Sequence, residues 1–183
     1  MTGKRNLYAV ILVAGLTLTG ASCEAKHGPV LPPAAEAAQS RPGSAGVSLI
    51  RMNDPKASGQ LLSGFYGIEA NSWRWTGGKF SARLNSPPSA ASAGAILTFE
   101  LSIPEVAIQK LGDVTLTASI NGVELQSARY DKAGPFAFTA DVPPSMCAAQ
   151  SVKVDFSLNK TFHAGADSRD LGIVASSLRL AGR

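Results

Sequence analysis

The sequence predicts an all-β domain, an antiparallel β-sandwich of jelly-roll type with about eight strands. Apolar and polar residues alternate with a period of two over most of the second half of the chain. Turn signals separate these segments, and no amphipathic helix is expected beyond a single turn around residues 105–111. A hydrophobic content of 45% with only 16% charged residues is typical of a globular body.

The folded unit, residues 47–183, is expected to begin at Val47, where Val-Ser-Leu-Ile-Arg-Met offers a first short strand. A further strand is expected at residues 79–84. Residues 97–103 and 114–120 alternate strictly between apolar and polar side chains. This alternation predicts strands with one buried face and one solvated face.

Asn121-Gly122 is the strongest turn signal in the chain, because a type I′ turn needs a positive φ at both central residues. It predicts a hairpin between residues 114–120 and 123–130. Two further inward-facing rows follow, at residues 136–142 and 152–158.

The last strand region changes phase. Its apolar residues occupy odd positions over 171–175 and even positions over 178–180, so the buried face switches around Ser176 and Ser177. A β-bulge at this point would absorb the change, because it adds one residue to one strand of a pair.

The first 22 residues follow the plan of a secretory signal peptide. Lys4 and Arg5 form a positive segment, and residues 7–18 form an apolar run too short to span a membrane comfortably. The small residues that precede Cys23 resemble a bacterial lipoprotein signal, in which this cysteine becomes the lipid-bearing first residue. The resemblance implies a membrane-anchored lipoprotein of the bacterial cell envelope. The sequence differs from that signal at Gly20, where such signals usually have leucine.

Ordinary cleavage after Ala21 or Ala25 is the alternative, and it would leave a soluble periplasmic or secreted protein. The chain's two cysteines, Cys23 and Cys147, would then be free to form a disulfide. Residues 23–46 are rich in alanine and proline and are expected to form a flexible tether. The net charge of +4 falls to +2 without Lys4 and Arg5, which is too little to indicate nucleic-acid binding.

Residues 64–75 form the first candidate segment, and they contain both tryptophans of the chain together with a carboxylate and an arginine. In an extended segment Trp73 and Trp75 project to one face and Arg74 to the other. If that face is exposed, the indoles can stack on a sugar ring while Glu69 or Arg74 binds its hydroxyls. The alternative is that both tryptophans belong to the core.

Residues 162–173 form the second candidate segment, and they contribute His163 and Asp167 as candidate ligand-binding residues. Arg169 in the same segment is predicted to meet Glu69 or a backbone carbonyl of residues 66–75, forming a structural ion pair or a charge-assisted hydrogen bond.

These two segments resemble a β-sandwich module appended to bacterial glycosyltransferases and envelope-polysaccharide proteins. The resemblance rests on Gly64-Phe65-Tyr66, Glu69, Trp73-Arg74-Trp75 and the run from Asp167 to Ile173. It implies a β-sandwich that is associated with glycans and is not catalytic.

Signals for enzymatic chemistry are scarce. There is no Gly-x-Ser-x-Gly elbow, no zinc-type spacing and no phosphate-binding glycine loop, so no metal or cofactor is expected. The expected function is therefore an exported, lipid-anchored, non-catalytic module that binds envelope or extracellular carbohydrate. A structural or protein-interaction module of the envelope is the alternative. A glycan hydrolase using Glu69 with Asp167 or Asp170 is a further one.

Overall fold

The computed structural model describes residues Val47–Arg183. The predicted signal peptide (1–22), the lipidation site Cys23 and the predicted tether (23–46) lie outside the described residues. Within the described part the chain forms nine strands joined by antiparallel pairing, so the predicted all-β sandwich is confirmed.

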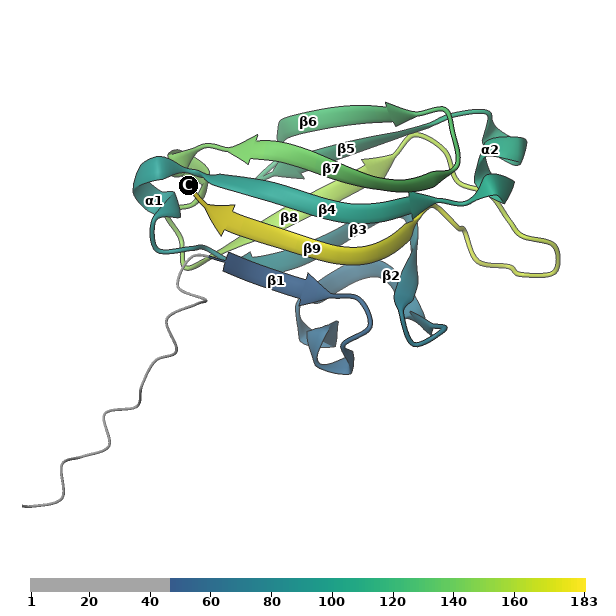
Figure 1. Ribbon diagram of the computed structural model, residues 1–183, viewed down its shortest axis with the longest axis horizontal. Helices are drawn as coiled ribbons and strands as arrows, with labels where there is room; N and C mark the ends of the chain where they lie inside the picture. The colour runs from purple at the N-terminus through teal and green to yellow at the C-terminus, as the bar shows by residue number, and fades with distance from the viewer. Residues whose placement is uncertain (1–46) are drawn as a thin grey trace, which may run out of the picture. The chain divides into compact units, whose positions relative to one another are not determined.

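The strands form two layers (Figure 1). In order across the sheet, the first layer contains β1 (Val47–Arg51), β9 (Val174–Gly182), β4 (Ala95–Ile103) and β7 (Gly134–Val142). The second contains β2 (Leu61–Glu69), β3 (Trp73–Asn85), β8 (Ser151–Leu158), β5 (Val114–Ile120) and β6 (Val123–Tyr130). The layers join where Arg74 and Trp75 of β3 pair with β9. This order is that of a jelly roll, with β2 added at the edge beside β3.

Within residues 47–183, four short helical segments connect the strands. They are η1 (Pro55–Gly59), α1 (Ala90–Ala93), α2 (Glu105–Leu111) and η2 (Pro144–Met146). The helical turn predicted around residues 105–111 is α2. No helix in the described part is long and apolar enough to cross a membrane.

Two local predictions are confirmed. Asn121 and Gly122 have φ values of 52° and 77°, as the turn between β5 and β6 requires. The β-bulge in β9 is present, because Glu100 pairs with Ser177 whereas Leu101 pairs with Ala175, which leaves Ser176 as the extra residue.

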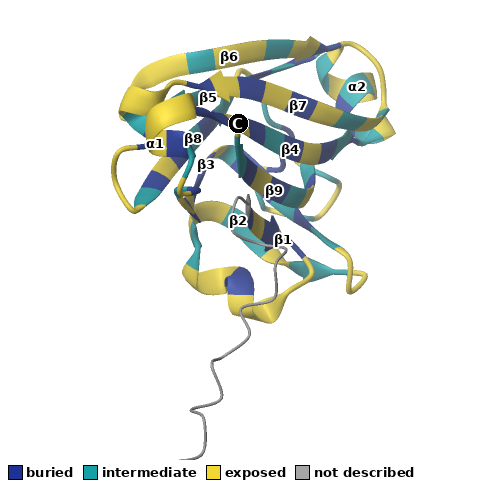
Figure 2. Cartoon of the chain, turned by 60° about the vertical axis from the view of Figure 1, so that its left-hand side comes forward, coloured by how far each residue is buried: buried dark blue, intermediate teal, exposed yellow. Residues whose placement is uncertain are grey.

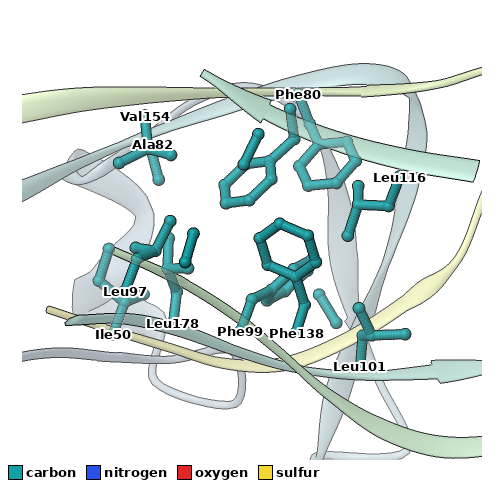
Figure 3. Close-up of a cluster of buried hydrophobic side chains, with 14 of the residues drawn as sticks. Ile50, Phe80, Ala82, Leu97, Phe99, Leu101, Leu116, Phe138, Val154 and Leu178 are labelled. Atoms are coloured by element: carbon teal, nitrogen blue, oxygen red, sulfur yellow. The ribbon is translucent and has the colours of Figure 1, made fainter. Parts of the chain in front are cut away.

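The core lies between the two layers and is built from the inward-facing rows (Figure 3). Burial alternates along β4, where fully buried Leu97 and Phe99 have exposed or half-buried neighbours, and a similar banding is visible on β7 (Figure 2). Phe80 of β3 stacks on Phe156 with ring centroids 5.0 Å apart, and Phe99 packs against both. Aromatic packing of this kind holds the layers together.

Candidate ligand-binding site

The hairpin between β2 and β3 carries the first half of the site. Glu69, the last residue of β2, is paired with Trp73, the first residue of β3, so both side chains lie on one face. Ala70 and Asn71 between them have φ values of 49° and 51°, and the Ser72 amide donates to the Glu69 carbonyl at 3.0 Å. Sequence reasoning missed this turn, because alanine rarely adopts a positive φ and therefore does not mark a turn.

Trp73 and Trp75 form an aromatic pair on that face. Their ring centroids are 5.7 Å apart and their planes are nearly perpendicular. Both residues are half-buried, so they are neither core residues nor freely exposed. Trp75 also packs edge-on against the buried ring of Phe162, with centroids 6.0 Å apart, and this contact holds its indole in place.

The loop between β8 and β9 carries the second half of the site. Phe162 and Leu171 form an antiparallel bridge with two backbone hydrogen bonds of 2.9 Å. Inside the bridge, the Asp167 amide donates to the Ala164 carbonyl, and the Arg169 carbonyl lies 3.0 Å from His163 Nδ1. The backbone of this loop is therefore held in a defined conformation beside the hairpin.

Arg169 ties the two halves together. Its Nη1 donates to Glu69 Oε1 at 2.9 Å, and its Nη2 donates to Asp167 Oδ2 at 2.7 Å. Its guanidinium also lies over the ring of Tyr66, 5.1 Å from the centroid, and the Tyr66 hydroxyl donates to the Asp170 carbonyl at 2.9 Å. Tyr66 was not among the predicted site residues, although its position in the aromatic 64–75 segment was a signal for it.

The charges in this cluster are mutually stabilised. Hydrogen bonds from the Arg169 side chain and backbone hold the pKa of the Asp167 carboxyl below its usual value. The hydrogen bond to Asp167, and to a smaller extent the one to Glu69, raises the pKa of Arg169. Both residues are thus charged at neutral pH, and 35% of the Arg169 side chain and 27% of the Asp167 side chain remain exposed to solvent.

The pairing of Glu69 with Asp167 does not suit glycosidase chemistry. A glycosidase general acid needs a raised pKa, whereas that of Asp167 is lowered. The Arg169 guanidinium binds both Glu69 and Asp167, so the two carboxylates face the arginine instead of a substrate bond. Among residues 47–183, no group of three or more His, Cys, Asp or Glu side chains could hold a metal ion.

The remaining two candidate residues are His163 and Arg74. His163 is exposed, and its Nε2 lies 3.4 Å from Asp170 Oδ1. Arg74 is buried on the opposite face of β3, where its Nε donates to the Met52 carbonyl and its Nη1 to the Tyr66 carbonyl, each at 3.0 Å. The structure therefore places Glu69, Trp73 and Trp75 side by side, links Asp167 to Glu69 through Arg169, and turns Arg74 to the other face of β3.

No protein-family model matches the sequence, and no curated protein matches it. Among solved structures, the CBM36-1 domain of a multidomain xylanase from the hindgut metagenome of Trinervitermes trinervoides is 11% identical. The match covers 75% of this chain and 98% of that domain, with a TM-score of 0.42. TmCBM27, a carbohydrate-binding module described for specific mannan recognition, is 14% identical over 74% of this chain and 95% of its own, with a TM-score of 0.40.

Dimeric latent PorU from Porphyromonas gingivalis is 10% identical over 74% of this chain and 12% of its own, with a TM-score of 0.43. With TM-scores of 0.40–0.43, none of these similarities assigns a role to this chain. The class that the fold itself defines is an antiparallel β-sandwich module.

Proposed function

We propose that this chain is an exported, lipid-anchored, non-catalytic module that binds cell-envelope or extracellular carbohydrate at the face formed by Trp73 and Trp75. The observation that carries the proposal is the pair of adjacent, half-buried indoles, one of them braced by Phe162. Rigid aromatic rings that keep part of their surface in solvent can stack on the apolar face of a sugar with little loss of side-chain entropy.

Polar groups for the sugar hydroxyls stand beside the indoles. Glu69 lies opposite Trp73 across the hairpin, and only its Oε1 is engaged by Arg169. An ionised carboxylate has two oxygens with about four acceptor sites, so Glu69 retains capacity to accept from hydroxyl groups. Since Arg169 also fixes its orientation, the carboxylate is presented in a single geometry, which favours specific binding.

Export and anchoring in this proposal rest on the N-terminal sequence. The thioether to lipid needs the thiol of Cys23, so Cys23→Ser is expected to move the protein from the membrane fraction to the soluble fraction or to leave it unprocessed. An unmodified protein found entirely in the soluble fraction would contradict the anchoring.

The binding proposal is tested on a glycan array, followed by titration of the best ligand. Trp73→Ala is expected to weaken binding about tenfold or more, because aromatic contacts contribute about 0.5–1.5 kcal/mol beyond the area they bury. The unfolding temperature should change little, because Trp73 is half-buried at the end of a strand. Trp75→Ala should lower both binding and stability, since Trp75 also packs against the core.

Phe136→Ala is the matched control. Phe136 is a half-buried aromatic residue on β7 that packs against Tyr130, and it lies in the other layer from Trp73. This variant should lose some stability but keep glycan binding. Glycan binding by Trp73→Ala at wild-type affinity would contradict the proposed site. A wild-type chain that binds no glycan would favour the alternative, a protein-interaction module.

A further inference from the structure

Arg74 is a buried cation whose contacts are all with neutral groups. It is 8% exposed, and its guanidinium donates to two backbone carbonyls and, at 3.5 Å, to the hydroxyl of Ser58. Within residues 47–183, no ion pair involves Arg74. Carbonyl dipoles stabilise a cation but do not neutralise it, and an unneutralised buried charge is costly.

The guanidinium borders an open pocket of about 240 Å³. Besides Arg74, the pocket is lined by Ser58, Leu61, Phe65, Tyr66 and Gly67. A guanidinium has five N–H groups, and three of those of Arg74 have a protein partner among the described residues. Arg74 therefore keeps two N–H groups without a partner among the described residues, and it brings a positive charge to a pocket that has apolar walls.

The walls of this pocket are held in place by the core and by a capped turn. Leu61 and Phe65 pack against the core, and the Phe65 ring lies edge-on to Phe80 with centroids 5.2 Å apart. Ser58 belongs to η1, where Asp54 Oδ1 accepts from the Lys56 amide at 2.8 Å and Ala57 is buried. The pocket is thus preformed, which reduces the ordering cost of binding a ligand.

We propose that this pocket binds the carboxylate group of a small organic acid, with Arg74 as its cationic partner. The planar guanidinium matches a carboxylate in charge and in geometry, and Leu61 and Phe65 offer apolar contacts to a carbon skeleton. A volume of about 240 Å³ holds several water molecules and is therefore large enough for a compact organic acid. Arg74 projects from the side of β3 opposite to Trp73 and Trp75. Tyr66 is the one pocket residue that also contacts the Arg169 cluster.

Calorimetric titration of the mature chain tests the proposal with acetate, glucuronate, glucose and sulfate as probes. Acetate and glucuronate are expected to bind in the millimolar range, whereas glucose, which shares the sugar ring but has no carboxylate, should not bind at this site. Nuclear magnetic resonance spectra should show that the acids shift the Arg74 side-chain signal. An unchanged Arg74 signal at millimolar acetate would overturn the proposal, and equal binding of sulfate would overturn the assignment to a carboxylate.

Two variants locate the site. Arg74→Gln should weaken acetate binding at least tenfold. Because this change also removes structural hydrogen bonds, Gly67→Leu is a second variant that fills the pocket without changing Arg74. Gly67 lines the pocket, and a Cβ added there meets no atom within 4 Å, so the leucine is expected to be tolerated. It should weaken binding at least tenfold with Arg74 intact.

Gly59→Leu is the matched control. Gly59 also has open space around an added Cβ, and it does not line the pocket, so this variant should bind acetate as the wild type does. Wild-type affinity in Gly67→Leu would contradict the site. Trp73→Ala should leave acetate binding unchanged, and this separates a failure here from a failure of the proposed carbohydrate site.

Discussion

Arg169 and Glu69 lie one hundred residues apart in the sequence and form an ion pair with 2.9 Å between Nη1 and Oε1. The pair joins the end of β2 to the loop that precedes β9. The Arg169 guanidinium also forms an ion pair with Asp167 and lies over the ring of Tyr66. A single side chain therefore contacts both halves of the candidate site.

Arg169→Ala is expected to lower the unfolding temperature by several degrees. It leaves the Glu69 and Asp167 carboxylates close together without their shared cation. Since the side chains are about one-third exposed, the loss should shrink in high salt, which screens their repulsion. Thermal unfolding in low and high salt measures both effects. Arg179→Ala, on an exposed position of β9, is the control, and an equal loss there would show that the cluster adds no stability.

The acid sensitivity of the protein should depend on Asp167. Its pKa is lowered in the folded chain from the ordinary value of 3.8. A depressed pKa means that the stabilisation is complete above about pH 4 and is lost as the pH falls through the folded-state value. Asp167→Asn should therefore destabilise the protein at neutral pH and flatten the decline in unfolding temperature below about pH 4. An acid profile identical to that of the wild type would show that another group controls it.

Gly64 and Gly67, both in β2, are predicted to respond very differently to alanine. Gly64 has a φ of 72°, and an added Cβ would lie 2.0 Å from the Lys79 carbonyl oxygen and 2.7 Å from Phe80 Cα. Gly64→Ala is therefore expected to cost about 3 kcal/mol or more in the free energy of unfolding, or to prevent folding. Gly67→Ala meets no atom within 4 Å and should change stability by less than about 1 kcal/mol. Denaturant titration of the two variants makes the comparison, and similar losses would mean that β2 does not approach β3 as closely as the structure shows.

A chain that starts at Val47 should unfold at nearly the same temperature as the mature protein. The preceding segment is rich in alanine and proline and has few large apolar residues, so it is not expected to bury surface against the sandwich. Differential scanning calorimetry of the two chains checks this. A loss of several degrees would place part of the predicted tether in the folded unit.

Most of the strand layout followed from the sequence, because it depends on short-range patterns, but β2 was not among the predicted strands and β3 begins six residues before the predicted strand at 79–84. The alternation over residues 97–103 predicts the banded burial of β4, and Asn121-Gly122 predicts its turn because those residues tolerate a positive φ. The change of parity around Ser176 predicts the bulge in β9, since side chains on a strand alternate strictly between faces.

Other features were decided only by the tertiary structure. Alternation placed Trp73 and Trp75 on one face, but their half-buried state depends on Phe162, a neighbour from a distant loop. The sequence predicts that Arg74 binds a ligand together with the tryptophans, because it lies between them. In the folded chain its guanidinium instead donates to the carbonyls of Met52, which follows β1, and of Tyr66 in β2. The reason is physical: a strand's period determines which way a side chain points, whereas its contacts and exposure depend on segments that only folding brings beside it.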